Sequence, residues 1–232
     1  MSLDKLYICI FVIFGLSSCS DSPKDSQGLP HSQIEVWLDS LSLAYDNNQW
    51  GNVSLYCDKI WKIDSLYNGL EAYYAQSLIG SNMLDSAINY LSSVINKELV
   101  PRYDLLQIQA FAYYIKGDIE QSSIIFDRCI SGANASFEYV ESVVRLYEED
   151  KHHKEAIHFR ERALMKLYKS NVRIEEKLSY AAYLDSIDPG NKVADYVHEQ
   201  ILPKGSDVYL PGFDDDVDDV HDMELFFSDP YF

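Results

Sequence analysis

Three histidines and one glutamate lie close together in the sequence and are the side chains best suited to bind a transition metal. They are His152, His153, His158 and Glu155. Imidazole and carboxylate groups are common zinc ligands, and a pair on one helix is typically four positions apart. His153 and His158 are five positions apart, so a helix would turn them to different sides. We therefore expect a solvent-exposed polar segment here and no metal site.

Acidic residues near the C-terminus have the spacing of the first ligands in an EF-hand calcium loop. Asp214, Asp216 and Asp218 would occupy its first, third and fifth positions. The sixth position, however, would be Asp219 where the loop needs glycine, and the twelfth would be Leu225 where it needs glutamate. A specific calcium site is therefore not expected, and weak calcium binding stays an open question.

Other arrangements that could support catalysis are missing from the sequence. It has no glycine-rich phosphate loop, no nucleophile elbow and no paired-cysteine metal site. We therefore expect no enzymatic activity and no cofactor. The formal net charge of −18 at pH 7 also disfavours nucleic acid as a partner, because binding to phosphates needs a basic surface.

The most regular feature of the sequence is a repeat of helix-like segments. Small or apolar residues open four such segments at a spacing of 34, 35 and 34 positions: Val53, Ala87, Ser122 and Ala156. Twelve positions earlier in each unit, a matching apolar stripe on a preceding helix includes Leu41, Ala75, Ala110 and Val144. Two helices in each unit of this length predict an all-α solenoid of about five helix pairs, a fold that usually binds other molecules.

The third unit resembles the tetratricopeptide repeat (TPR). The residues that carry the resemblance are Ala110, Tyr113, Gly117, Ile119, Ser122 and Phe126. The other units have Asn48, Asn82 and Lys151 at the turn, and the fourth has Arg160 where a large apolar residue is usual. Asparagine still tolerates the positive φ of such a turn. The resemblance implies four TPR-like repeats over residues 34–169, with an unrelated helical bundle as the alternative.

The N-terminus indicates export and attachment to a membrane. Lys5 precedes an apolar stretch from Leu6 to Leu16, which is too short to span a bilayer as a mature helix and is typical of a signal peptide. The following Leu16-Ser17-Ser18-Cys19 resembles the bacterial lipobox. This resemblance implies removal of residues 1–18 and lipidation of Cys19 by acyl chains such as palmitate. An ordinary secretory signal or an uncleaved anchor helix is the alternative.

Residues 19–33 are rich in Ser, Asp, Pro and Gly and have no apolar period, which predicts a flexible tether behind the lipidated cysteine. Acidic residues soon after Cys19 resemble the lipoproteins of the Bacteroidota. We therefore expect a lipid-anchored protein of the cell envelope, at the outer membrane.

The four cysteines have different expected fates. Cys9 would leave with the signal peptide and Cys19 would be lipidated. Cys57 and Cys129 fall on core positions of second helices two repeats apart. Because repeats in a solenoid contact only their neighbours, we expect two buried thiols and no disulfide.

Two more helices are expected after the fourth repeat, over residues 172–187 and 193–202, with Asp188-Pro189-Gly190 between them. Their predicted inward residues are Ile174, Leu178, Ala181, Ala182 and Leu184, then Val193, Val197 and Ile201. We expect this pair, within residues 170–202, to cap the last repeat.

The last thirty residues, 203–232, contain nine acidic residues and one lysine. Such a segment repels itself and is expected to be disordered. It ends in an aromatic cluster that includes Phe226, Phe227, Tyr231 and Phe232. A cluster of this composition is suited to docking in a pocket of a protein partner.

The resemblance to TPR proteins also implies a groove lined by the first helix of each repeat. The implied contact residues are Tyr45, Gln76, Gln107, Phe111, Tyr114, Glu141 and Arg145. Such a groove would be aromatic and amide-rich in its middle and acidic toward the fourth repeat. It would suit a neutral or basic extended segment, or a sugar stacked on an aromatic ring.

These features favour a membrane-anchored scaffold of the bacterial envelope that binds a protein partner through the groove, the acidic tail or both. The alternative is a glycan-binding lipoprotein that works with an outer-membrane transporter.

Overall fold

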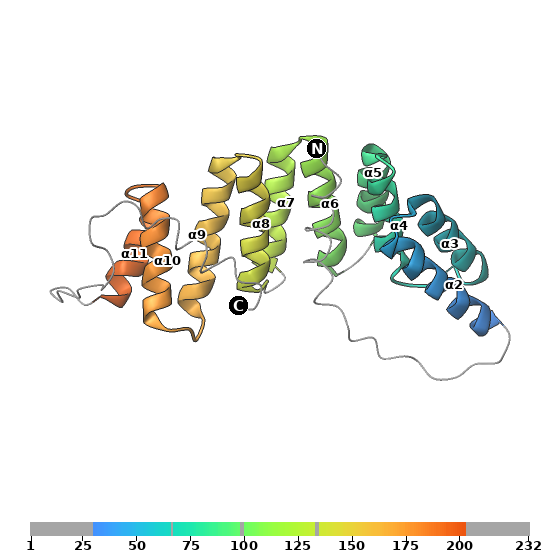
Figure 1. The fold of residues 1–232 in the computed structure, drawn as a ribbon, viewed down its shortest axis with the longest axis horizontal. Coiled ribbons are helices and arrows are strands. Elements are labelled where there is room, and N and C mark those ends of the chain that lie inside the picture. The colour runs from blue at the N-terminus through green and yellow to red at the C-terminus, as the bar shows by residue number, and fades with distance from the viewer. Residues whose placement is uncertain (1–29, 66, 98–99, 133–134, 203–232) are drawn as a thin grey trace. The chain divides into compact units, whose positions relative to one another are not determined.

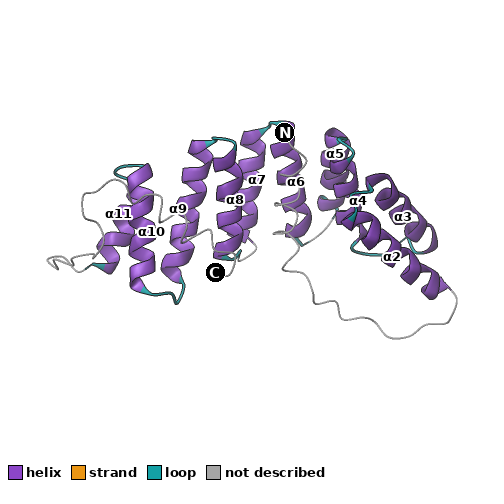
Figure 2. Ribbon diagram, in the orientation of Figure 1, coloured by secondary structure: helices purple, strands orange, loops and turns teal. Residues whose placement is uncertain are grey.

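The computed structural model describes residues 30–65, 67–97, 100–132 and 135–202 of the 232-residue chain. Every regular element in these ranges is an α-helix (Figure 2), which confirms the predicted all-α fold. The helices (Figure 1) are α2 (Pro30–Asp46), α3 (Trp50–Ile63), α4 (Leu70–Gly80), α5 (Leu84–Ile95), α6 (Tyr103–Lys116), α7 (Ile119–Gly132), α8 (Phe137–Glu149), α9 (His153–Lys169), α10 (Ile174–Ile187) and α11 (Lys192–Ile201). The predicted signal peptide, Cys19, the acidic tail and most of the predicted tether lie outside the described residues. Residues 30–33, also predicted as tether, belong to α2, which corrects the end of the tether.

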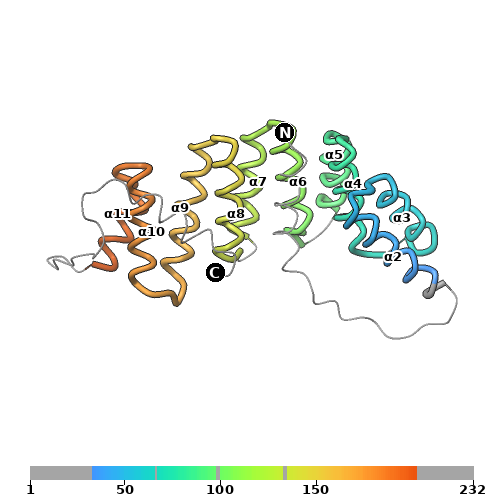
Figure 3. The backbone as a smooth tube through the Cα atoms, viewed as in Figure 1, coloured from blue at the N-terminus to red at the C-terminus, as the bar shows by residue number. Residues whose placement is uncertain are grey.

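The described residues form two compact units, of which unit 1 ends at Val172 and unit 2 begins at Arg173. In unit 1, α2 packs against α3, α6 against α7, and α8 against α9. Helix α4 packs against both α3 and α5, and α5 also packs against α6. The backbone reverses direction at the short turn inside each pair (Figure 3). Unit 1 is therefore a series of helix pairs in contact with their neighbours.

The residues that set the sequence repeat lie inside unit 1. Val53, Ala87 and Ser122 are 0% exposed and Ala156 is 3% exposed. The four stripe residues twelve positions earlier are buried as well: Leu41, Ala75, Ala110 and Val144. The hydroxyl of Tyr147 donates to that of Ser122 over 2.9 Å, so the one polar anchor has a partner. The period of the sequence is therefore the period of the core.

The turns inside the four helix pairs share one geometry. The residue five positions before each anchor has a positive φ, which is 56° at Asn48, 59° at Asn82, 87° at Gly117 and 63° at Lys151. In the first turn, the N–H of Asn48 donates to the carbonyl of Tyr45 and that of Gln49 donates to the carbonyl of Ala44. The other three turns repeat this pair of bonds. They are the two hydrogen bonds of a Schellman cap, which satisfies the last carbonyls of the first helix.

We expect Lys151→Gly to stabilise unit 1. A residue with a side chain pays roughly 1 kcal/mol to hold the left-handed conformation that glycine adopts freely. The greater freedom of glycine in the unfolded chain offsets part of this gain, so we expect an increase of about 0.5 kcal/mol in the free energy of unfolding. The measurement is the midpoint of urea unfolding.

The matched control for Lys151→Gly is the reverse change at the third turn. A Cβ at Gly117 would meet no atom within 4 Å, so Gly117→Ala adds only backbone strain. It should lower the free energy of unfolding by about 1 kcal/mol. Unchanged midpoints in both variants would show that turn conformation does not limit stability.

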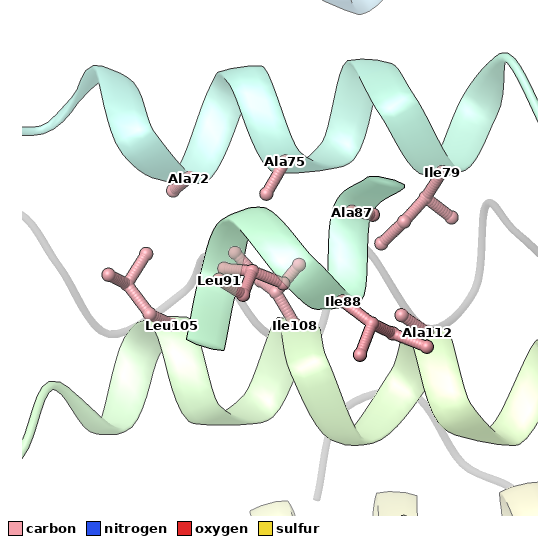
Figure 4. Packing of buried hydrophobic residues seen from close by; sticks show 9 residues of the cluster. All are labelled: Ala72, Ala75, Ile79, Ala87, Ile88, Leu91, Leu105, Ile108 and Ala112. Carbon is pink, nitrogen blue, oxygen red and sulfur yellow. The ribbon is translucent and has the colours of Figure 1, made fainter. Parts of the chain in front are cut away.

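The second and third repeats share a core of aliphatic side chains, several of them small (Figure 4). Its buried members are Ala72, Ala75 and Ile79 on α4, Ala87, Ile88 and Leu91 on α5, and Leu105, Ile108 and Ala112 on α6. The junction of the first two repeats instead contains the rings of Tyr45, Trp50 and Tyr73. Between the last two repeats lie Phe126, Tyr147 and Phe159. The middle junction therefore packs mainly aliphatic side chains, whereas aromatic rings pack at the junctions on either side.

Unit 2 contains α10 packed against α11. Leu178 and Leu184 on α10 and Val197 on α11 are buried. Asn191 caps α11, because its Oδ1 accepts hydrogen bonds from the backbone N–H of Val193 at 3.0 Å and of Ala194 at 3.2 Å. The helix pair predicted after the fourth repeat is thus present, and its role as a cap stays a prediction.

The start of α10 differs from the expectation. The helix begins at Ile174, two residues after the predicted start, and the Ile174 side chain, expected to point inward, is 56% exposed. Helix α10 has 14 residues and α11 has 10. Helix α10 is therefore about one turn longer than α11.

Candidate partner-binding surfaces

The three histidines near the start of α9 do not converge on one point. His152 packs edge-on against Tyr114 and Tyr147, with ring centroids 6.1 and 6.2 Å apart. His153 is exposed. Nε2 of His158 lies 3.3 Å from Oδ1 of Asp127 on α7. In the ranges that the structure describes, no group of His, Cys, Asp and Glu side chains is arranged to hold a metal ion.

Cys57 and Cys129 are free thiols in the core of unit 1, and both are 0% exposed. Burial raises the pKa of each thiol from 9.0 to about 12. Because the thiolate is the reactive form, both groups are inert near neutral pH. The prediction of two buried thiols without a disulfide is confirmed.

These thiols should react only when the chain unfolds. In a chain with Cys9 and Cys19 changed to serine, we expect an aromatic disulfide reagent to modify neither thiol at pH 8, and both in urea. The pKa of each thiol is 9.0 in the unfolded chain and about 12 in the folded chain. The unfolded chain therefore loses these protons first as the pH rises, and the free energy of unfolding falls between pH 9 and about pH 12. Fast modification of the folded chain at pH 8 would contradict the inert state.

The seven predicted groove contacts fall into two groups. Gln76, Phe111 and Tyr114 are buried, at 6%, 6% and 5% exposure. The partly or fully exposed ones are Tyr45, Gln107, Glu141 and Arg145. The aromatic contacts predicted in the tail, at Phe226, Phe227, Tyr231 and Phe232, lie outside the described residues.

Tyr114 belongs to the junction between α6 and α8. Its hydroxyl lies 2.6 Å from Oδ2 of Asp150 and 2.7 Å from the carbonyl oxygen of Leu146. Its ring meets that of Tyr147 edge-on at 5.3 Å and is stacked with Phe111 at 6.4 Å. The structure thus places Phe111 and Tyr114 in the core, which corrects the expectation that they face a partner. Gln76 on α4 is buried as well, so it does not line an open groove either.

Arg160 is buried where the repeat usually has a large apolar residue, with 7% of the residue exposed. Its Nε and Nη2 lie 2.8 and 2.6 Å from Oε1 of Glu148. Its Nη1 is 4.0 Å from Oε1 of Glu141. The guanidinium therefore joins α9 to α8 and partly neutralises Glu148 and the predicted groove contact Glu141, at the end of the groove that was expected to be acidic.

A set of residues that the sequence pattern did not indicate lies on α2 and α3, where each is partly or fully exposed. We call it the α2–α3 aromatic surface, and it consists of Trp37, Leu55, Tyr56 and Lys59. Nζ of Lys59 lies 4.8 Å from the ring centroid of Tyr56 and 5.7 Å from that of Trp37, within cation–π range. Leu55 is 46% exposed. Trp37 and Tyr56 are partly exposed, so part of each residue is accessible to a ligand.

The helix pairs of unit 1 share a spacing of 34 or 35 residues, a buried anchor on the second helix and a Schellman turn between the helices. The fold is a TPR-like α-solenoid. It is the fold that the sequence predicted, although three of its four turns lack glycine.

A solved structure similar to this TPR-like chain contains the nearly identical TPR-like repeats of a kinesin light chain from Podospora anserina. The two chains share 14% identical residues with a TM-score of 0.49, and the match covers 75% of this chain and 95% of the other. No protein-family model matches the chain, and no curated protein matches it. Similarity at this level supports no inference about a partner. None of the described helices is long and apolar enough to cross a membrane.

Proposed function

We propose that this chain is a membrane-anchored scaffold of the bacterial envelope that binds a protein partner. The observation that carries the proposal is the stack of TPR-like helix pairs in unit 1, since such repeats generally mediate contacts between proteins. The Leu16-Ser17-Ser18-Cys19 sequence supports attachment by lipidation of Cys19 at the outer membrane.

Four of the seven predicted groove contacts are at least partly exposed, so they are the residues on the helices that a partner can reach. Arg145 on α8 is exposed, and Glu141 one turn before it is partly exposed. Gln107 on α6 and Tyr45 on α2 are also partly exposed. A partner that contacts these residues would meet an amide at Gln107, charged groups at Glu141 and Arg145, and the partly exposed ring residue Tyr45. The aromatic end of the tail would supply a separate docking element.

A crosslinked pull-down from native membranes tests this function. The samples are the full chain, Gln107→Ala/Arg145→Glu, a chain that ends at Leu202, and Cys19→Ala. We expect the full chain to capture one defined envelope protein and Cys19→Ala to leave the membrane fraction. Loss of the partner in the shortened chain would assign docking to the tail, and loss in the double variant would assign it to the helices. No protein partner in any sample would overturn the proposal.

The α2–α3 aromatic surface favours a second candidate, a glycan-binding lipoprotein that works with an outer-membrane transporter. Aromatic residues that are partly exposed, as Trp37 and Tyr56 are, can stack on sugar rings. A soluble oligosaccharide at 100 times its Kd would stabilise the chain by about 2.7 kcal/mol and so raise its Tm. Trp37→Ala/Tyr56→Ala should abolish that shift if this surface is the site. An unchanged Tm across a panel of neutral oligosaccharides would exclude this candidate.

A further inference from the structure

Positive charge in this acidic chain gathers on one helix of unit 1. The whole chain has a net charge of −18. The outward side of α9, with the turn that precedes it, nevertheless carries five basic side chains, which we call the cationic α9 face: Lys151, Lys154, His158, Arg162 and Lys169. Four of them are exposed and His158 is partly exposed.

The register of α9 explains why these side chains share one side. They follow one another at steps of three, four, four and seven positions, which keeps them in one stripe along a helix. The opposite side of α9 carries the buried residues Ala156, Phe159, Ala163 and Leu167. The two acidic residues of this helix, Glu155 and Glu161, are only partly exposed. The stripe is therefore not interrupted by an exposed carboxylate of its own helix.

Helix α7 contributes one carboxylate to the stripe. Oδ1 of Asp127 lies 2.8 Å from Nε of Arg162 and 3.3 Å from Nε2 of His158. Asp127 thus holds the guanidinium of Arg162 in place, and its carboxylate compensates about one positive charge of the cationic α9 face. Among the described residues, no carboxylate pairs with Lys151, Lys154 or Lys169. Three ammonium groups therefore remain available to an external anion.

We propose that the cationic α9 face binds an acidic, extended segment of a protein partner. The proposal rests on the scaffold function above and adds the chemistry of the partner. The distance from Lys154 to Lys169 corresponds to about 22 Å of helix. An extended chain covers that length with about seven residues. A short run of aspartate and glutamate would thus match the stripe in both length and charge.

A short acidic segment fits this face better than a membrane or a nucleic acid does. Charges are screened over about 8 Å at physiological ionic strength, so a bound segment senses mainly the local lysines. An anionic bilayer or a long nucleic acid extends well beyond the stripe and meets the negative remainder of the chain. The apolar side of α9 is also buried in unit 1, so it is not available for insertion into lipid.

Fluorescence anisotropy with a dye-labelled peptide of eight alternating Asp and Glu residues tests the proposal on the full chain in detergent. We expect binding that weakens as salt is added. Lys154→Glu/Lys169→Glu should lower the affinity at least tenfold. The matched control is Lys62→Glu/Lys97→Glu, which changes the net charge equally at two exposed lysines elsewhere in unit 1 and should change the affinity less than twofold. Circular dichroism verifies that both variants are folded.

Three results would overturn the proposal. One is the absence of peptide binding at low salt, and another is an equal loss of affinity in both variants. The third is stronger binding to vesicles with 30% phosphatidylserine that only the α9 variant loses, which would assign the face to a lipid surface. If the full chain still captures a protein partner in the pull-down, any of these three results rejects only this surface and the scaffold function stands.

Discussion

Replacing Arg160 with methionine should lower the free energy of unfolding of unit 1 by about 3 kcal/mol, because removing one member of a buried ion pair leaves the other charge uncompensated. The side chain of Arg160 is 9% exposed, and its partners Glu141 and Glu148 are 14% and 33% exposed. Glu148 regains some hydration when the guanidinium is gone, so the cost falls at the low end of the range for buried pairs. Methionine fills the space without a charge.

Urea unfolding followed by far-UV circular dichroism measures this cost. Arg160→Met/Glu141→Gln/Glu148→Gln should recover most of the loss, since no buried charge is then left unpaired. Arg162→Met is the matched control, because it breaks a more exposed ion pair with Asp127 and should cost less than about 1 kcal/mol. An equal loss of unfolding free energy in Arg160→Met and Arg162→Met would show that burial of the Arg160 ion pair does not increase its contribution to stability.

Gly80→Ala should destabilise unit 1 by about 1 to 2 kcal/mol, although alanine is the better helix former. A Cβ at residue 80 would overlap Cδ2, Cε2 and Nε1 of the Trp50 indole ring. The ring is not free to move aside, since it packs edge-on against Tyr45 with centroids 5.7 Å apart. Overpacking of this kind costs about 1 to 3 kcal/mol, and the helix propensity of alanine offsets up to about 1 kcal/mol of that.

Gly51→Ala measures the effect of helix propensity without the steric overlap with Trp50 that Gly80→Ala also introduces. A Cβ at Gly51 on α3 would meet nothing within 4 Å. Gly51→Ala should therefore raise the free energy of unfolding by about 0.5 to 1 kcal/mol through propensity alone. In a Trp50→Leu background, the penalty of Gly80→Ala should disappear, because the two residues are then no longer coupled. A urea midpoint that rises as much for Gly80→Ala as for Gly51→Ala would refute the contact with Trp50.

The repeat could be predicted from the sequence because its determinants are local. The anchor residue that recurs every 34 or 35 positions is buried in each of the four helix pairs. The residue five positions before it adopts the positive φ that closes the turn. Cys57 and Cys129 followed from the same register. Lys151 had been seen as a departure from the pattern, yet it occupies the same turn as Gly117.

The candidate site was harder to predict because it depends on contacts between repeats. Positions that line a groove and positions that touch the next repeat alternate along one helix. The sequence alone therefore did not separate Tyr114, whose hydroxyl bonds Asp150, from the exposed Arg145. The partners of Arg160 were missed for the same reason, although Glu148 lies twelve positions before it on the preceding helix. The spacing of the basic residues on α9 was visible in the sequence, but the pairing of Arg162 and His158 with Asp127 on α7 was not.

The pairing of Arg160 with Glu148 also restricts the order in which mutations could have produced the fourth repeat. A glutamate whose side chain is 33% exposed keeps more of its hydration beside an apolar neighbour than an arginine that is 9% exposed, so an unpaired glutamate costs less here than an unpaired arginine. An ancestor with an apolar residue at position 160 could therefore gain the glutamate first and the arginine afterwards. The opposite order passes through a less stable intermediate, in which the buried arginine lacks Glu148. Once the arginine is present, the glutamate can no longer be lost without cost, so this evolutionary step has a direction and is difficult to reverse.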